Sequence, residues 1–230
     1  NLISFTRENN LEGNTYHPYS WGGYLAWESK RPIFINPAMA DLGGDAFWDG
    51  VDFEKGERVS EVIKKYDLSL VIAPSWMPLP YALSLKDDWS LVYWDNFGTV
   101  FARSGYGNNE AIKKHIMDIK YFSDSVGSQL KKYEPEKIPK LIENYQEAIN
   151  RQPDLLLARY RLGLTYQLLG DCPKAIEQYE ELLDFNYKLG SAHFRLAECY
   201  QKIGDRELAA KEEKLGEKYV KGERWWRGRR

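Results

Sequence analysis

The chain has 230 residues, of which 43% are hydrophobic and 29% are charged. This balance is typical of folded globular proteins and excludes a disordered or collagen-like chain. The formal net charge is −2, so no excess of positive charge attracts nucleic acid, and we expect no nucleic-acid partner. No apolar run in the sequence approaches the roughly 18 residues that a membrane-spanning helix needs.

A chain of this length predicts about two domains, and its two parts differ in composition. Residues 1–105 contain 9 basic and 14 acidic side chains, a net charge of −5, whereas residues 106–230 contain 23 and 20, a net charge of +3. The first part also holds six of the eight tryptophans. We predict an α/β domain over residues 1–105, a connecting helical segment over 106–135 and a helical repeat domain over 136–230.

The first domain alternates strand-like and helix-like segments. Runs of β-branched and aromatic residues between turn residues predict strands at 32–36, 69–73, 90–94 and 99–102. Helices are expected at residues 19–29, 56–66 and 78–85. Strands separated by helices predict a small mixed, mostly parallel α/β sandwich. The turn at residues 95–98 predicts that the last two strands form an antiparallel hairpin.

Motifs that would indicate catalysis are absent from the sequence. It has no glycine-rich nucleotide motif, phosphate-binding loop or nucleophile elbow, so we predict no catalytic residue, no cofactor and no metal in this chain. A string of aspartates lacks the alternate-residue spacing of a calcium loop and predicts a solvated loop; it consists of Asp41, Asp45, Asp49 and Asp52. Cys172 and Cys199 are expected to be buried free thiols.

One hypothesis places a ligand cleft in the first domain. Open α/β sheets bind ligands at the carboxyl ends of their parallel strands, and tryptophans at such a cleft could stack on a sugar ring. The candidate cleft residues are Trp21, Gly22, Gly23, Asn36, Asp41 and Trp76. The glycine pair has two interpretations: its N–H groups face an anion, or it permits close packing.

The second domain repeats itself with a period of 34 residues. Residues 156–189 align with 190–223, and the matched pairs are Ala158 with Ala192, Leu162 with Leu196, Tyr166 with Tyr200, Gly170 with Gly204, Asp171 with Asp205 and Ala175 with Ala209. This period and pattern are typical of tetratricopeptide repeats, which stack into a helical solenoid. The small residues, such as Gly163 and Ala175, are expected to meet where the two helices of a repeat touch. Gly170 and Asp171 are expected to end one helix and cap the next.

The resemblance to tetratricopeptide repeats implies a binding scaffold, in which the first helix of each repeat lines a concave groove. The repeat register predicts that this groove is lined by Leu157, Tyr160, Arg161, Leu164, Gln167, Leu168, Phe194, Arg195, Glu198, Gln201 and Lys202. Aromatic and arginine side chains are suitable anchors for a protein or peptide partner. The alternative is that Tyr160 and Phe194 pack on the degenerate repeat helices that precede residue 156 or on the first domain.

The first domain also resembles a known family. The similarity is to the extracytoplasmic C-terminal domain of bacterial multi-pass membrane proteins related to GT-C class glycosyltransferases, many of which append tetratricopeptide repeats. The residues that carry it are 19–27, 32–36, Asp41, 65–68, 70–72, 89–95 and 100–103. One departure is that the segment after the second strand reads Ile35-Asn36-Pro37-Ala38 where the family usually has Ile-Asp-Gly-Arg.

The resemblance implies an accessory module without an active site of its own, because the catalytic carboxylates of that family lie in its membrane part. It places the chain on the periplasmic face of a bacterial inner membrane, next to the membrane portion of its own protein. Two other readings are a freestanding cytoplasmic repeat adaptor and a small sugar- or nucleotide-binding domain. The tail at 221–230, with five basic residues and two tryptophans, either touches anionic lipid weakly or folds back on the last helix.

Overall fold

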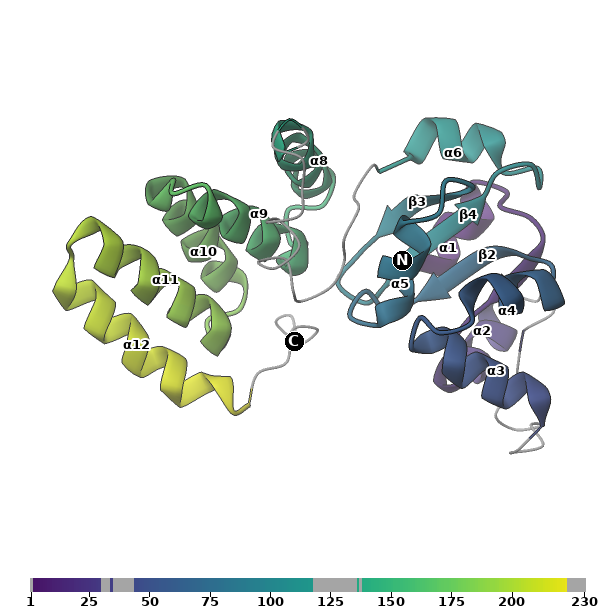
Figure 1. The fold of residues 1–230 in the computed structure, drawn as a ribbon, viewed down its shortest axis with the longest axis horizontal. Coiled ribbons are helices and arrows are strands. Elements are labelled where there is room, and N and C mark those ends of the chain that lie inside the picture. The colour runs from purple at the N-terminus through teal and green to yellow at the C-terminus, as the bar shows by residue number, and fades with distance from the viewer. Residues whose placement is uncertain (1, 30–33, 35–43, 118–135, 137, 223–230) are drawn as a thin grey trace. The chain divides into compact units, whose positions relative to one another are not determined.

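The computed structural model describes residues 2–29, 34, 44–117, 136 and 138–222. The chain divides into two compact units, Asn1–Asp124 and Ser125–Arg230, and Figure 1 shows the elements of each. Most of the predicted connecting segment and the end of the basic tail lie outside the described residues. No helix within the described ranges combines the length and apolar character needed to cross a bilayer.

The first unit contains a four-stranded mixed sheet in the order β1-β2-β4-β3. Its strands are β1 Asn14–Tyr16, β2 Leu68–Ala73, β3 Trp89–Trp94 and β4 Thr99–Arg103. β1 runs parallel to β2, whereas β4 pairs antiparallel with both β2 and β3. The mixed sheet is confirmed, but the prediction that it is mostly parallel is wrong for the described strands, because β4 turns back from β3 and inserts beside β2. The strand predicted at 32–36 lies, except for Phe34, outside the described residues.

The predicted hairpin between β3 and β4 is confirmed, and its turn is held by one side chain. Asp95 Oδ1 accepts hydrogen bonds from the backbone N–H groups of Phe97 and Gly98, at 2.8 and 2.9 Å. Residue 98 must be glycine because a Cβ atom there would lie 2.6 Å from the carbonyl oxygen of Ala73 on β2. The turn is therefore pressed against the end of the central strand.

The helices of the first unit pack around this sheet (Figure 1). They are α1 Leu2–Glu8, the single 3-10 turn η1 Tyr19–Trp21, α2 Gly22–Ser29, α3 Asp45–Glu54, α4 Val59–Lys65, α5 Pro78–Ser84 and α6 Asn109–His115. One core joins Leu2 and Leu25 to Leu70 and Ile72 of β2. All six residues of β2 are buried, as expected for a central strand covered on both faces.

The aspartate string does not form the predicted solvated loop. Residues 45–54 form α3, and the side chain of Asp49 is only 6% exposed. It contacts Lys65 and Arg58 at 2.7 and 2.9 Å and accepts a hydrogen bond from Tyr66. Asp49 therefore holds α3 against α4. Asp41 lies outside the described residues.

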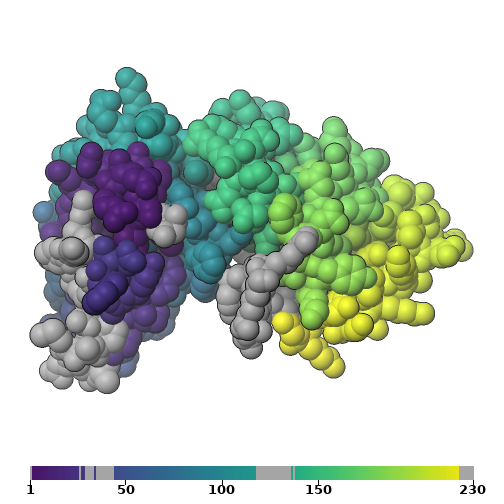
Figure 2. All heavy atoms as spheres, turned by 180° about the vertical axis from the view of Figure 1, so that it is seen from behind, coloured from purple at the N-terminus to yellow at the C-terminus, as the bar shows by residue number. Residues whose placement is uncertain are grey.

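The regular secondary structure described in the second unit is all helical. Its helices are α8 Ile138–Arg151, α9 Leu156–Leu168, α10 Cys172–Phe185, α11 Gly190–Ile203 and α12 Arg206–Val220. Each packs against the next in the chain, and in the space-filling view the colour passes from green to yellow along the unit (Figure 2). The predicted helix pairs at residues 156–189 and 190–223 thus correspond to α9 with α10 and α11 with α12.

The turns between paired helices use the residues that the repeat pattern predicts. Gly170 and Gly204 have φ angles of +83° and +91°, the left-handed region that glycine adopts without strain. Asp171 Oδ1 accepts a hydrogen bond from Lys174 N, and Asp205 Oδ1 accepts one from Leu208 N at 3.0 Å. Both aspartates therefore cap the helix that follows.

Candidate partner-binding surface

The predicted groove residues fall into three groups by exposure. Glu198, Gln201, Lys202 and Leu168 are exposed; Leu157, Tyr160, Phe194 and Arg195 are half-buried; Arg161, Leu164 and Gln167 are buried. All of them lie on α9 or α11, the first helices of the two repeats. The exposed and half-buried residues form the candidate surface.

A hydrogen-bonded group of side chains joins α9, α10 and α11, and we call it the Arg195 cluster. It consists of Tyr160, Gln167, Tyr179, Arg195 and Glu198. Arg195 Nη1 donates to Glu198 Oε2 at 2.9 Å, and its Nε contacts Tyr160 Oη at 3.4 Å. Gln167 Nε2 donates to the same Glu198 oxygen at 2.7 Å, and Tyr179 Oη donates to Gln167 Oε1 at 3.0 Å. The cluster thus orients an aromatic ring, a cation and an anion on adjacent repeats.

The hydrogen-bond partners of Arg195 stabilise its charged form. Partial burial opposes the charge, but hydrogen bonding to Tyr160 and the nearby carboxylate of Glu198 outweigh it, so the pKa of Arg195 lies above its ordinary value. The Arg195–Glu198 pair is partly exposed, with side chains 35% and 50% accessible. A partner can therefore reach both charges from solvent.

Two predicted groove residues belong to the packing between helices instead. Arg161 is 1% exposed and Leu164 is 4% exposed, and Arg161 hydrogen-bonds to the buried Tyr145 of α8. Because α8 packs against α9, it covers positions that the repeat pattern alone would leave open. The prediction that these two side chains line an open groove is corrected accordingly.

The ring of Phe194 packs against α12 within the last repeat. A Cβ atom at Gly216 of α12 would lie 2.8 Å from Cδ1 of Phe194. The glycine therefore lets α12 approach the ring. This contact lies within the repeat to which Phe194 itself belongs, so it is neither of the two packings that the alternative proposes for this residue. Tyr160 contributes to the Arg195 cluster.

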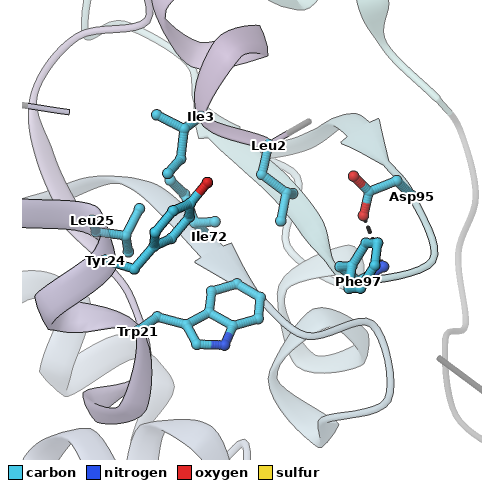
Figure 3. Close-up of a pocket in the computed structure, with 8 residues that line it drawn as sticks. All are labelled: Leu2, Ile3, Trp21, Tyr24, Leu25, Ile72, Asp95 and Phe97. Atoms are coloured by element: carbon cyan, nitrogen blue, oxygen red, sulfur yellow. Dashed lines mark hydrogen bonds between the residues drawn. The ribbon is translucent and has the colours of Figure 1, made fainter. Parts of the chain in front are cut away.

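The candidate ligand cleft of the first unit is only partly assembled. Trp21 lines a cavity of about 340 Å³ with Leu2, Ile3, Tyr24, Leu25, Ile72, Asp95 and Phe97. Figure 3 shows Trp21, Tyr24 and Leu25 on one side of this cavity and Asp95 and Phe97 on the other. Gly22 and Gly23 begin α2, and a Cβ atom at Gly23 would meet no atom within 4 Å, so close packing does not explain that glycine. Trp76 is 48% exposed, and it does not line the cavity.

The lining of this cavity does not favour a sugar or a nucleotide. Of the lining residues that the structure describes, Asp95 alone is charged. Its Oδ1 accepts from Phe97 N and Gly98 N, while Oδ2 accepts from Tyr93 Oη at 3.1 Å. The other lining side chains are aliphatic or aromatic. Polar ligands need several convergent hydrogen-bonding groups. Asn36 and Asp41, the other polar cleft candidates, lie outside the described residues.

The parts of the chain that the structure describes contain no group of three or more His, Cys, Asp or Glu side chains placed to hold a metal ion. The predicted groove contains every residue of the Arg195 cluster except Tyr179. The aromatic position four residues after Ala175 was the available signal for that residue. Its partner Gln167 could be identified only from the packing of α9 against α10.

One comparison with known protein families agrees with the repeat pattern. The family model of the tetratricopeptide repeat matches residues 157–185, so the chain contains such a repeat. Similar solved structures include MamA MSR-1, with 22% identity and a TM-score of 0.36 over 37% of this chain and 49% of that one. Another is the type III secretion translocator chaperone SycD of Yersinia enterocolitica, with 20% identity and a TM-score of 0.38 over 43% of this chain and 74% of that one. The chain spans about half the length of the MamA structures it matches. No curated protein matches it.

Proposed function

We propose that the second unit is a protein-interaction module without catalytic activity, which binds a segment of a partner polypeptide across α9 and α11. The Arg195 cluster carries this proposal, because it presents Tyr160, Arg195 and Glu198 together on two adjacent repeats. The tetratricopeptide match at residues 157–185 supports the same reading.

The chemistry of the surface suits a peptide with both polar and apolar groups. Tyrosine and arginine are enriched among the residues that contribute most to protein interfaces. Their hydrogen bonds restrict the side chains before binding, which lowers the conformational entropy lost on association. Exposed Gln201 and Lys202 extend the polar edge of the surface by about one helical turn beyond Glu198.

The test compares two charge reversals in affinity capture from the native organism. Glu198→Lys places a second cation beside Arg195, whereas Glu177→Lys makes the same change at an exposed position of α10 outside the Arg195 cluster. We expect proteins captured by the unchanged chain and by Glu177→Lys to be lost with Glu198→Lys, a reduction of about tenfold or more. Thermal unfolding of all three proteins checks that they fold. Equal capture by the two variants would contradict the proposal.

We further propose that this chain is the extracytoplasmic part of a bacterial membrane protein of the GT-C glycosyltransferase type. The aromatic and glycine pattern at residues 19–27 and 89–95 supports this context. In that setting the first unit lies near the membrane portion and the repeats recruit a partner on the periplasmic face. The weak lipid contact proposed for the basic tail is tested by flotation with anionic vesicles, with and without residues 221–230.

Membrane fractionation with an antibody to this chain distinguishes the membrane context from a freestanding adaptor. A carbonate-resistant band well above 26.8 kDa, the mass of this sequence, is the expected result. A soluble band near that mass would leave a freestanding adaptor, in which the Arg195 cluster still binds a partner.

A further inference from the structure

A second cavity in the first unit has a different character from the one beside Trp21. It has a volume of about 260 Å³ and lies between η1 and α3. Four aromatic residues and one carboxylate dominate its lining: Tyr16, Tyr19, Phe34, Phe47 and Glu54. We call it the aromatic cavity. Its volume is just below the roughly 300 to 1,000 Å³ of typical ligand pockets, so its ligand has few atoms.

The rings of the aromatic cavity are inclined to one another. Tyr19 and Phe47 have centroids 5.5 Å apart and planes at 88°. Tyr16 and Phe34 have centroids 4.9 Å apart and planes at 59°. Each of these pairs is in direct contact, and all four rings line the cavity. The face of an aromatic ring carries negative potential, which attracts a cation.

Among the described lining residues, Glu54 supplies the only carboxylate. It accepts hydrogen bonds from Tyr16 Oη, at 3.2 Å, and from the backbone N–H of Tyr19. A carboxylate has about four lone-pair positions for hydrogen bonds, so acceptor capacity remains. Burial raises the pKa of Glu54 above its ordinary value in spite of these two donors. A cation beside Glu54 would therefore relieve an unfavourable burial of charge.

The basic side chains near α3 are already engaged with other acids. Lys65 contacts Asp49, and Arg58 contacts both Asp49 and Asp52. Lys55 lies 4.0 Å from Asp52. Within the described part of the chain, no ion pair includes Glu54. The position of a cation in the aromatic cavity is thus not taken by a neighbouring lysine or arginine of the described residues.

We propose that the aromatic cavity binds a small organic cation, a quaternary or methylated ammonium group, with its charge beside Glu54 and its methyl groups against Tyr19 and Phe47. Aromatic rings combined with a carboxylate fit this chemistry because methylated ammonium groups are weakly hydrated and have a large apolar surface. The net charge of −5 over residues 1–105 also favours a cation. The site is independent of the partner-binding surface proposed for the second unit.

Choline is the first probe, and its neutral analogue is the alcohol with carbon in place of the choline nitrogen. The two molecules have nearly the same shape and differ in charge. Titration of the whole chain at constant ionic strength, followed by NMR of backbone amides, should give saturable shifts at α3 with choline. We expect the alcohol to bind about tenfold more weakly, the size of effect that a desolvated cation–π contact and a carboxylate produce.

Three variants separate the proposed site from a general effect of charge. Glu54→Gln keeps an oxygen for Tyr16 and removes the charge, so choline should bind about as weakly as the alcohol. Glu57→Gln makes the same change at an exposed acid three residues later and should leave choline binding unchanged. Phe47→Leu should weaken choline binding severalfold while keeping an apolar side chain. If Glu54→Gln fails to fold, Phe47→Leu still tests the proposed site.

Vesicle flotation identifies the source of the cation. Binding to phosphatidylcholine vesicles that is lost in Glu54→Gln assigns the site to a lipid headgroup, and binding of free choline without vesicle binding assigns it to a soluble methylated amine. Either result supports the proposal. Unsaturable shifts with choline, equal affinity for the alcohol, or equal affinity of the unchanged chain and both Glu54→Gln and Phe47→Leu would overturn it.

Discussion

Gly163 of α9 lies directly against the ring of Tyr179 on α10: a Cβ atom at residue 163 would be 2.7 Å from Cε1 of the tyrosine. The repeat pattern predicts a small residue here, and that is confirmed. Its predicted neighbour was Ala175, and the three atoms nearest to a Cβ atom at residue 163 all belong to the ring of Tyr179. Tyr179 is fully buried and also belongs to the Arg195 cluster, so the glycine determines how closely α10 supports the candidate surface.

We expect Gly163→Ala to destabilise the second unit. Alanine favours a helix over glycine by about 1 kcal/mol, but the overlap with the buried ring costs about 1 to 3 kcal/mol because the ring has no space to move. The matched control is Gly23→Ala on α2, where a Cβ atom meets nothing within 4 Å. Thermal and denaturant unfolding should show a lower free energy of unfolding for the first variant and an unchanged or higher one for the second. A stabilised Gly163→Ala would contradict the close contact.

Asp49→Asn should weaken the first unit by loosening α3 from α4. The variant keeps the size of the side chain but removes the charge that faces Lys65 and Arg58. Because Asp49 is 6% exposed, we expect a loss of about 1 to 3 kcal/mol. Asp52→Asn removes a more exposed partner of Arg58 and should cost less than about 1 kcal/mol. Chemical denaturation compares the two, and equal losses would count against the special role of Asp49.

Because of the carboxylate of Asp49, we expect the first unit to lose stability in acid. Hydrogen bonding from Lys65, together with Tyr66 and Arg58, outweighs desolvation and lowers the pKa of Asp49 below its ordinary value. A carboxyl group with a lowered pKa in the folded state stabilises above the unfolded pKa of about 3.9, and this contribution is lost as the pH falls through the folded value. Unfolding measured from about pH 5 to pH 2 should show a smaller decline for Asp49→Asn than for the unchanged chain.

His17 predicts a second pH dependence, closer to neutrality. Its Nδ1 donates to the carbonyl oxygen of Pro18 at 3.0 Å, because a carbonyl can only accept, and its Nε2 accepts from the N–H of Phe34 at 3.1 Å. The imidazole is therefore neutral in this arrangement. Burial lowers the pKa of His17 below its ordinary value, and the bond to Pro18 opposes this only in part.

A histidine with a lowered pKa stabilises the fold above its unfolded pKa of about 6.5, and the contribution is lost as the pH falls through the folded value. We expect the free energy of unfolding to decrease from about pH 7.5 to pH 5. His17→Gln, which lacks a titrating ring, should show a flatter profile over that range. Identical slopes for the two proteins would assign the dependence to other groups.

The two cysteine thiols should react slowly in the folded chain. Cys172 and Cys199 are 3% and 0% exposed, and burial, with hydrogen bonding between the two thiols, raises the pKa of Cys199 to about 12. Because the thiolate is the reactive form, a thiol reagent at neutral pH should label them only after denaturant unfolds α10 and α11. Rapid labelling of both thiols in the native chain would contradict this prediction, and Cys199→Ser identifies which thiol reacts first.

Local spacing along the chain was enough to predict a large part of the fold. The left-handed glycines and the capping aspartates at residues 171 and 205 depend on contacts within a few residues, and the 34-residue period marks where the pattern starts again. The helices of the repeats could therefore be located from the sequence. The β3–β4 hairpin could be predicted for the same reason, because its turn is held by Asp95 and its immediate neighbours. The groove positions on α9 and α11 came from the register of the repeats and stay a prediction.

Contacts between segments far apart in the chain decided the features that the sequence did not predict. The three-residue strand β1 exists because it pairs with β2, more than fifty residues away, and its own sequence has too few apolar residues to predict a strand. Asp49 was assigned to a solvated loop because its cations come from a later helix. Arg161 was assigned to the groove because the repeat pattern does not show how α8 covers it. The aromatic cavity likewise joins residues 16, 19, 34, 47 and 54, whose side chains converge only when η1 packs beside α3. Helical period and turn chemistry are local properties, whereas burial and the pairing of charges depend on which elements meet in the folded chain.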